Sequence, residues 1–456
     1  MSKDEVLFYC TFCDFQYSKW QGQCDECGKW GTVSELRGGE EVSAEVVSLD
    51  TSQDVRRVTT GINEVDSVLG GGIVPGSLIL LAGDPGIGKS TLVLQMIECV
   101  GDPHPNPLPS TGEGIKRGVL YVCGEESPEQ IGMRMRRLGV KDANIQFLPE
   151  TRISPICGTI RSKNPGLVIV DSIQTISDEQ IQSEAGNVSQ IRSSTGQLLK
   201  LAKETNIPII VIGHVTKEGV AAGPQALAHM VDVVLYLEGD KLHQYRLLRG
   251  VKNRFGPTNQ VGVFSMSDSG LKEVKNPSEL FLGEHREKVP GSVVSVIMEG
   301  TRPFLIEIQA LTNKTSYGYP KRATSGFDLS RLELLIAVLG RRGGLKLDDQ
   351  DVFLNIVGGL HTKDPALDLA ACLAIASSLS NQSMPNKSIV LGEVGLGGEV
   401  RLVAHFDGRV KEAARLGFNV MYVPSELDNK SQNTRIMPVK DISNALFVLG
   451  INKLKK

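Results

Sequence analysis

The sequence predicts an α/β protein whose largest domain is a mostly parallel sheet flanked by helices. Three observations predict this class. Short apolar runs at 78–82, 119–123 and 167–170 are each followed by a glycine or an acidic residue, as in buried parallel strands with polar groups at their carboxyl ends. The first run leads through a glycine-rich loop into a helix. Two cysteine pairs precede this region and the composition changes after Pro277, so smaller domains are expected on both sides.

Composition limits the class of protein. Of 456 residues, 41% are hydrophobic and 22% are charged, which suits roughly two to four globular domains. The net charge of −3 gives no overall positive field, so any contact with nucleic acid must use local basic patches. No apolar run approaches the roughly 20 residues of a membrane span, and the start, Met-Ser-Lys-Asp-Glu, lacks a signal region. We therefore expect a cytoplasmic protein without membrane contact.

The N-terminal segment 1–36 carries two C-x2-C pairs separated by ten residues. In a reducing compartment this spacing predicts a tetrahedral zinc site, and metal binding would supply the folding energy that so short a segment lacks. Unconnected free thiols or a redox pair are the alternatives. Trp20 and Trp30 flank the second pair, and we expect them to pack on the module rather than stack on a ligand. The expected Zn²⁺ ligands are Cys10, Cys13, Cys24 and Cys27.

The glycine-rich loop follows a polar linker, 37–58, and belongs to the domain expected over 59–275. Its pattern, G-x-x-x-x-G-K-[ST] between a strand and a helix that opens at Thr91, is that of a phosphate loop. Glycines let successive N–H groups face phosphate oxygens, and the helix N-terminus adds positive charge. Lys89 is placed to reach the β- and γ-phosphates of ATP, and the Ser90 hydroxyl to ligate Mg²⁺. A chance glycine-rich turn would not fill every fixed position. The expected ATP-binding residues are Gly83, Asp84, Pro85, Gly86, Ile87, Gly88, Lys89, Ser90 and Thr91.

Further candidates stand at the carboxyl ends of later strands. Glu125 follows the run 119–123 and is the candidate base for the attacking water, with Glu126 as the alternate and a solvated acidic turn as the ordinary explanation. Asp171 ends the next run in the Walker B arrangement and is expected to hold Mg²⁺ through its water shell. His214 follows the strand expected over 207–212, where it either senses the γ-phosphate or is an ordinary surface histidine.

Other stretches of this domain fit no strand or buried helix. Residues 102–117 hold four prolines in seven positions and predict an exposed insertion without function. Residues 174–195 are too polar for a core and are placed to face a pore, ahead of a helix over 196–205. Residues 217–228 form a second flexible segment.

A basic run without acidic residues lies at 241–254. Such a run is usually a solvated face. Here it ends in a turn over 252–257, which could hold Lys252 and Arg254 toward a neighbouring subunit.

The chain as a whole resembles the RadA (Sms) family of bacterial DNA-repair ATPases. The resemblance rests on the cysteine module, the loop GDPGIGKST, the strand end GEES, the Walker B strand and the string KNRFG at 252–256. It implies a RecA-like core that assembles as a hexameric ring on single-stranded DNA, acts on branched recombination intermediates and works with a RecA-type recombinase. It also implies that KNRFG acts both on nucleotide at the subunit interface and in DNA binding, which we transfer to Lys252 and Arg254.

The C-terminal part, 276–456, resembles the proteolytic domain of Lon proteases. That site needs a nucleophilic serine and a lysine to deprotonate it. With Pro365 setting the register, Ala366 stands opposite the nucleophile and Asp407 opposite the base, so the catalytic pair is missing. The expected role is assembly and contact with DNA through exposed basic residues, for which the candidates are Arg341, Arg342 and Lys346.

The sequence therefore predicts an ATPase that moves on single-stranded DNA and promotes branch migration. In this interpretation Lys252 and Arg254 act in trans on a neighbour's ATP, as arginine fingers do. An ATP-dependent Lon-like protease and a DNA-independent clock-type ATPase ring are the alternatives.

Overall fold

The structure is a computed structural model of the 456-residue chain. The part that we describe comprises residues 7–12, 15–36, 57–101, 118–140, 144–214, 227–239, 245–278, 282, 289–316, 318–424 and 435–451. Most of the linker, the proline-rich insertion 102–117 and most of the segment 217–228 lie outside these residues. The chain divides into two compact units, Met1–Val55 and Arg56–Lys456, and each is described by itself.

The first unit is a small antiparallel sheet with the strand order β2-β1-β3. Its strands are β1 (Leu7–Cys10), β2 (Gln16–Tyr17) and β3 (Val33–Leu36). Cys10, Cys24 and Val33 are its buried apolar residues. Both tryptophans contact the module, since Trp20 Nε1 donates to the Val33 carbonyl oxygen at 3.1 Å and a Cβ on Gly22 would lie within 4 Å of both rings, but they lie on its surface and are 63% and 74% exposed. So small a unit has too little interior to cover side chains of that size.

The second unit contains a nine-stranded sheet with the order β12-β11-β10-β9-β4-β8-β7-β5-β6. Its strands from β4 to β9 pair in parallel, and β10 to β12 continue it antiparallel. This confirms the predicted RecA-like P-loop core with a mostly parallel sheet. The strands are β4 (Leu78–Gly83), β5 (Val119–Cys123), β6 (Ile145–Leu148), β7 (Leu167–Asp171), β8 (Ile209–His214), β9 (Val233–Glu238), β10 (Tyr245–Asn253), β11 (Val261–Ser267) and β12 (Gly270–Glu273).

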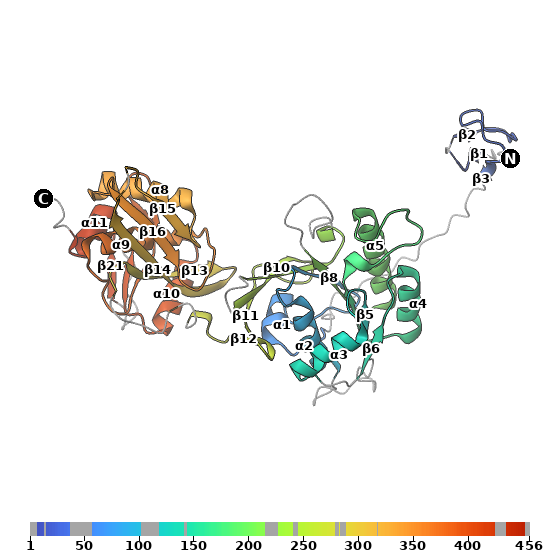
Figure 1. Ribbon diagram of the computed structural model, residues 1–456, viewed down its shortest axis with the longest axis horizontal. Helices are drawn as coiled ribbons and strands as arrows, with labels where there is room; N and C mark the ends of the chain where they lie inside the picture. The colour runs from blue at the N-terminus through green and yellow to red at the C-terminus, as the bar shows by residue number, and fades with distance from the viewer. Residues whose placement is uncertain are drawn as a thin grey trace, which may run out of the picture. The chain divides into compact units, whose positions relative to one another are not determined.

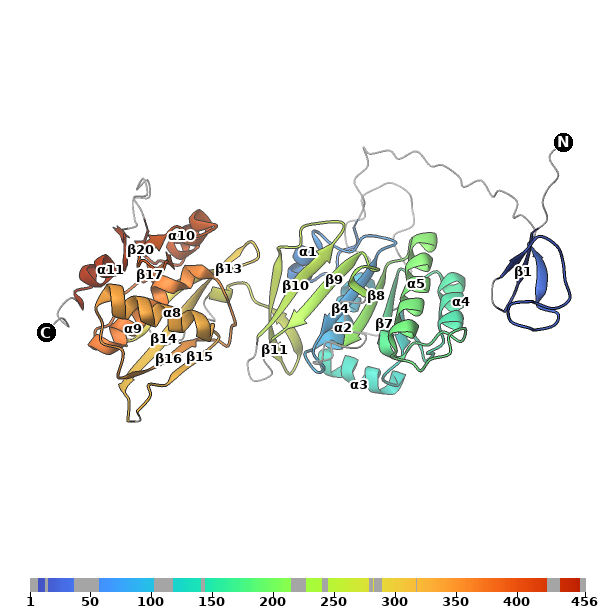
Figure 2. The same cartoon turned by 90° about the horizontal axis from the view of Figure 1, so that it is seen from above.

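Helices cover both faces of this sheet, which is why β4, β5 and β7 are buried at every position. Apolar side chains of α1, α2 and α3 form one buried cluster with Ile79 and Leu81, whereas those of α4 and α5 form another with Leu78 and Leu80. Figures 1 and 2 show α4 and α5 side by side along the sheet. The helices are α1 (Asn63–Leu69), α2 (Lys89–Gly101), α3 (Pro128–Leu138), α4 (Ile153–Lys163) and α5 (Val188–Thr205).

Three expectations about this domain need correction. Helix α2 begins at Lys89, two residues before the predicted start. Helix α5 begins at Val188, so the end of the polar stretch 174–195 is helical rather than an exposed segment. Gln190 is 2% exposed and its amide donates to the Ile181 carbonyl oxygen at 3.0 Å, which shows that hydrogen bonding lets this polar stretch be buried. Lys252 lies within strand β10, which ends at Asn253, rather than starting the basic turn.

The C-terminal part forms separate sheets. One has the order β13-β14-β16-β15, another is β17-β20-β21, and β18 pairs with β19. These strands are β13 (Ser292–Glu299), β14 (Arg302–Lys314), β15 (Arg322–Ser325), β16 (Gln350–Ile356), β17 (Ser388–Val390), β18 (Glu393–Val394), β19 (Val400–Arg401), β20 (Val420–Val423) and β21 (Arg435–Pro438).

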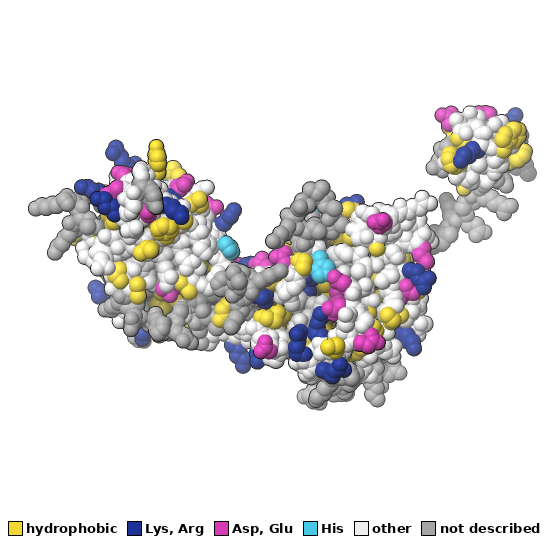
Figure 3. Space-filling view, viewed as in Figure 1, with side chains coloured by type: hydrophobic (Ala, Val, Ile, Leu, Met, Phe, Trp, Pro, Cys, Tyr) yellow, Lys and Arg dark blue, Asp and Glu magenta, His cyan; other side chains and the backbone are white. Residues whose placement is uncertain are grey.

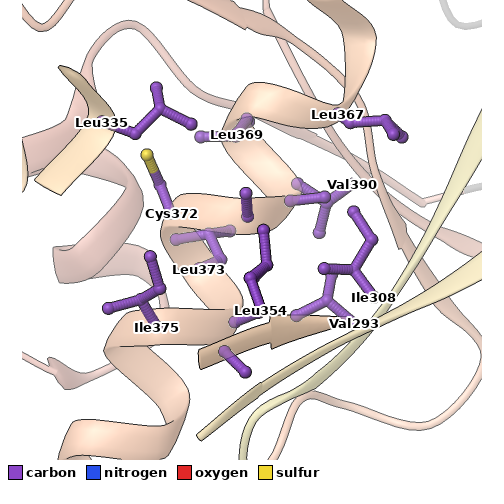
Figure 4. Packing of buried hydrophobic residues seen from close by; sticks show 14 of the residues in the cluster. Val293, Ile308, Leu335, Leu354, Leu367, Leu369, Cys372, Leu373, Ile375 and Val390 are labelled. Atoms are coloured by element: carbon purple, nitrogen blue, oxygen red, sulfur yellow. The ribbon is translucent and has the colours of Figure 1, made fainter. Parts of the chain in front are cut away.

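A largely buried helix, α9 (Asp368–Ser380), packs against β13 and β14 at the centre of this part (Figure 4). It starts four residues later than predicted because the single turn η3 (Pro365–Leu367) precedes it. The other helices are α8 (Leu329–Val338), which continues into the π-helical turn η2 (Leu339–Gly343), α10 (Phe406–Arg415) and α11 (Ile442–Val448).

Candidate nucleotide-binding site

The phosphate loop joins the end of β4 to the start of α2. Gly83 has φ +152°, and a Cβ there would lie 2.3 Å from the Leu237 carbonyl oxygen of the neighbouring strand β9. A Cβ on Gly88, where φ is +116°, would lie 2.7 Å from Met266 Cε. Both positions therefore require glycine, for the backbone angle and for space. Helix α2 begins directly at Lys89, so its N-terminal N–H groups face the loop.

Lys89 is held inside the loop and is only 4% exposed. Its Nζ donates to the carbonyl oxygens of Gly83 at 2.9 Å and Asp84 at 3.0 Å, and lies 3.1 Å from His214 Nδ1. Burial lowers the pKa of Lys89, and the carboxylates of Asp171 and Glu125 oppose that shift. The lysine is thus a partly desolvated cation, which interacts strongly with phosphate oxygens.

Asp171 lies at the end of β7, beside Cys123 at the end of β5. Its Oδ2 accepts a hydrogen bond from the Tyr121 hydroxyl at 2.6 Å, whereas its Oδ1 is buried and has no hydrogen-bond partner among the described residues. Burial and this carboxylate raise the pKa of Tyr121 well above its ordinary value, so the hydroxyl remains a donor. A carboxylate fixed through one oxygen, with the other oxygen unpaired, suits the hydrated Mg²⁺ of an ATP site.

The two glutamates after β5 lie in different surroundings. Glu125 Oε2 is 3.1 Å from His214 Nε2, so this histidine lies between Glu125 and Lys89. Glu126 forms an ion pair with Arg134 of α3. The N–H groups of Gly124 and Glu125 donate to the Asp171 carbonyl oxygen at 2.8 and 3.2 Å, which ties this turn to the end of β7. The geometry therefore favours Glu125 over Glu126 as the carboxylate with access to water.

These groups surround one cavity of about 720 Å³, large enough for a nucleoside triphosphate. The structure thus brings together the phosphate loop, Glu125, Asp171 and His214. The described residues that line the cavity are Pro85, Gly86, Gly88, Lys89, Ser90, Thr91, Glu125, Glu126, Arg134, Arg137, Leu138, Asp171, His214, Met266, Ser267, Asp268 and Gly270.

Some supporting residues were not predicted from the sequence. Tyr121 gives no signal beyond a hydroxyl in an otherwise apolar strand. Arg246 counted only as part of a basic run, but it is 6% exposed and its Nε donates to the Ile87 carbonyl oxygen of the phosphate loop at 3.2 Å. That contact ties the phosphate loop to strand β10.

Lys252 and Arg254 do not line the described part of this cavity. Lys252 Nζ donates to the carbonyl oxygens of Ala228 at 2.6 Å and Val231 at 2.8 Å, and Arg254 pairs with Asp232 at 3.3 Å. On the face shown in Figure 3, Lys and Arg side chains are interspersed with Asp and Glu side chains.

The cysteine module brings three of its four cysteines together. The Sγ atoms of Cys10, Cys24 and Cys27 lie within 4.8 Å of one another, whereas Cys13 lies outside the described residues. The Tyr17 hydroxyl is 3.0 Å from Cys24 Sγ. Clustered thiols at tight turns fit a tetrahedral Zn²⁺ site.

In the C-terminal part, Ala366 is fully buried in η3 and Asp407 lies in the first turn of α10. The three basic candidates Arg341, Arg342 and Lys346 are exposed in and after the turn η2. In the described part of the chain, no helix is long and apolar enough to cross a membrane.

Comparison with known proteins identifies relatives of the chain. Residues 44–220 match the family model described as an AAA domain. The chain is 46% identical over 437 residues to a protein of Pseudomonas aeruginosa named DNA repair protein RadA, a match that covers 93% of this chain and 94% of that protein. A protein of the same name from Bacillus subtilis is 44% identical over 465 residues, covering 98% of this chain and 99% of the relative.

Two solved structures are similar over about half of the chain. The crystal structure of the RadB recombinase has a TM-score of 0.37 and 25% identity, and covers 48% of this chain and 100% of that one. A KaiC-like protein of Pyrococcus horikoshii has a TM-score of 0.39 and 20% identity, with the same coverage.

Proposed function

The chain belongs to the RadA family of DNA repair proteins, and from this premise we propose that it is a DNA-stimulated ATPase that moves along single-stranded DNA. In this proposal it works as the hexameric ring implied by the resemblance. It acts on branched recombination intermediates beside a RecA-type recombinase and promotes branch migration. The observation that supports it most is the convergence of the phosphate loop, Asp171 and Glu125 on one cavity of nucleotide size.

In this function the chain's own residues bind the phosphates, hold the metal ion and activate the attacking water. Lys89 would leave the loop carbonyls for the β- and γ-phosphates, because a phosphate oxygen offers a full charge where a carbonyl offers a partial one. Ser90 and Asp171 would hold hydrated Mg²⁺, which neutralises charge on the phosphates. Glu125 would accept a proton from the attacking water. His214, between Glu125 and Lys89, would register whether the γ-phosphate is present.

Part of the site comes from a neighbouring subunit in this proposal. Lys252 near the end of β10 and Arg254 in the turn after it lie outside the described lining of the cavity, and in this proposal they would act on the ATP of an adjacent subunit. An arginine that enters in trans stabilises transition-state charge on the transferred phosphoryl group. Hydrolysis would therefore depend on assembly, and we expect the specific activity to rise with protein concentration.

The other domains serve assembly and docking in this proposal. The cysteine module would hold Zn²⁺ through its four cysteines. The C-terminal part would be a Lon-like domain without proteolytic activity, with DNA contacts at Arg341, Arg342 and Lys346, which are exposed.

Steady-state ATP hydrolysis with and without single-stranded DNA tests the proposal. The protein concentration must be high enough for rings to form. We expect several-fold stimulation by single-stranded DNA and little by short duplex DNA. Hydrolysis that ignores DNA at every concentration would contradict the motor function and favour a protein-directed ATPase.

A further inference from the structure

The turn that ends β10 is fixed by almost every residue in it. The Asn253 side chain donates to the Leu69 carbonyl oxygen at 3.1 Å and accepts from the Phe255 N–H at 2.9 Å. A Cβ on Gly256 would lie 3.4 Å from the Gly70 Cα, so the turn packs closely against the end of α1. Lys252 Nζ is occupied by backbone carbonyl oxygens. The turn is therefore a rigid platform rather than a mobile loop.

Arg254 differs from the rest of this turn. Its side chain is 54% exposed, and it contacts the core through Asp232, with 3.3 Å between Nη1 and Oδ1. The Arg254 N–H also donates to the Asp232 carbonyl oxygen at 3.2 Å. Lys252 and Arg254, which the sequence presents as an equivalent pair, thus have different surroundings. Lys252 binds to its own chain, and Arg254 presents a guanidinium that is anchored at one end.

Asp232 is buried and held from several directions. It is 1% exposed and directly precedes β9. Its Oδ2 accepts from the Leu78 N–H at 3.1 Å and from Lys203 Nζ at 2.7 Å, and its own N–H donates to the Leu78 carbonyl oxygen at 3.0 Å. These contacts fix the carboxylate against β4, the strand that leads into the phosphate loop. Its remaining oxygen faces Arg254.

We propose that Asp232 is a positioning residue that aims Arg254 at the ATP of the neighbouring subunit. The inference rests on the proposed role of Arg254 in trans. An arginine side chain has many rotamers, and an exposed one would sample them unless a fixed carboxylate selected one direction. A guanidinium has five donors in a planar fork, so Asp232 can hold one edge while another edge remains available for phosphate.

The test uses mixed rings of the full-length protein. Arg254→Ala subunits keep their own ATP site but lack the arginine, whereas Lys89→Ala subunits lack a working site but keep the arginine. If the arginine acts in trans, mixing the two restores hydrolysis. Where mixing restores hydrolysis, we then replace the Lys89→Ala subunits by Lys89→Ala/Asp232→Asn subunits. The rate of ATP hydrolysis in these mixed rings should be at least tenfold lower, because a misplaced catalytic group loses about 10- to 100-fold in rate. The KM for ATP should stay unchanged, because the binding site itself is untouched.

Two further variants separate positioning from a structural role. Asp232→Asn in the Arg254→Ala background should cause no additional loss, since Asp232 acts only through Arg254. Lys200→Met removes an exposed ion pair with Glu204 on the same helix as Lys203, leaves Asp232 untouched and should keep near-normal kcat, which makes it the matched control. Additive losses in the double variant, or higher activity in Asp232→Asn, would overturn the proposal.

Asp232→Glu keeps the charge and guards against misfolding of Asp232→Asn. It should lower kcat several-fold, because an added methylene moves the guanidinium that the carboxylate holds. A wild-type kcat in this variant would overturn the positioning role. If mixing fails to restore Arg254→Ala, the trans function itself is wrong, which is a result distinct from a failure at Asp232.

Discussion

Asp171 of the ATPase core differs in its hydrogen bonding from the aspartates that the C-terminal part encloses. In the core, Asp171 has a buried oxygen without a hydrogen-bond partner among the described residues. In the C-terminal part, Asp364 is paired with Arg409 at 2.7 Å and also accepts from the Met298 N–H at 3.0 Å. A buried polar atom without a partner costs free energy, whereas a paired one is largely compensated. Of these two carboxylates, the one with an oxygen that lacks a hydrogen-bond partner therefore lies in the core.

This difference tells where chemistry is expected. A carboxylate with an unpaired oxygen can take up a metal or a water, but one that is enclosed by an arginine and backbone N–H groups has no such capacity left. Asp368 repeats the pattern of the C-terminal part, since it pairs with Arg331 of α8 and accepts from the Val394 N–H at 3.1 Å. The ion pairs there support the fold, whereas Asp171 in the core keeps an oxygen that can bind a ligand.

Lys89→Ala should have the largest effect of the variants that test whether the ligand-binding groups lie in the core. It removes the buried cation of the phosphate loop, so both nucleotide affinity and hydrolysis should fall, the latter by roughly 10³-fold. Turnover is measured by phosphate release and binding by a fluorescent ATP analogue. Arg246→Met removes the contact to the Ile87 carbonyl oxygen but leaves Lys89 in place, so it is expected to lose less. Normal turnover in Lys89→Ala would refute the assignment of the site.

Variants of the two glutamates after β5 test which carboxylate of the core is the general base. Glu125→Gln should lower kcat by about 10²-fold or more with nearly unchanged ATP affinity, because a general base is lost. Glu126→Gln weakens only the pair with Arg134 and should keep most of the activity. Single-turnover kinetics measures the chemical step in both. The reverse ranking would transfer the role of base to Glu126.

Arg409→Met should change stability rather than chemistry. It removes the buried arginine and leaves Asp364, whose side chain is only 11% exposed, without its ion-pair partner, which costs up to about 3–5 kcal/mol. We expect a lower urea midpoint for the C-terminal part, with ATP affinity of the core preserved. Arg415→Met removes an exposed ion pair on the same helix and should cost under about 1 kcal/mol. Equal effects of the two variants would mean that burial does not distinguish these pairs.

Because the pKa of Lys89 is lowered, we expect a smaller effect of pH on ATP binding. Burial lowers this pKa, so between the lowered value and 10.5 the lysine of the free protein loses its proton. Rising pH therefore weakens ATP binding, by at most about tenfold per pH unit for one proton. The unfolded chain holds more protons in this window, so stability without ATP rises as affinity falls. Titration of ATP binding from pH 8 upward, with thermal unfolding in parallel, checks both signs.

Much of the core was predictable from the sequence because its signals are local. The phosphate loop and the runs of β5 and β7 each carry their pattern within a few residues, so the convergence of Lys89, Glu125 and Asp171 follows from parallel strand order. The partners that orient them were not predictable. Tyr121 reaches Asp171 from 50 positions away, and Asp232 meets Arg254 across two strands. Such contacts depend on register and rotamer, which no local pattern encodes.

The predictions of element boundaries and of burial were wrong where tertiary contacts determine them. The polar stretch 174–195 looked unfit for a core, but Gln190, in the first turn of α5, is buried because its side chain donates to backbone carbonyl oxygens of the preceding loop. The tryptophans of the cysteine module contact it but remain largely exposed, because the module is too small to cover them. Composition predicts average burial, and these residues depart from the average for specific structural reasons.

The smallest expected effect concerns proteolysis. Ala366 is fully buried in η3, and the nearby carboxylate of Asp364 accepts the Ala366 N–H at 3.0 Å while it pairs with Arg409. Ala366→Ser alone should therefore produce no degradation of casein with ATP present, since no lysine stands ready to deprotonate the hydroxyl. Ala366→Ser/Asp407→Lys should also remain inactive, because Arg409 still occupies the carboxylate beside the site and water cannot reach a buried serine. Casein cleavage by either variant would mean that the site is only one substitution or two from activity. The Asp364–Arg409 ion pair would then not prevent substrate and water from reaching residue 366.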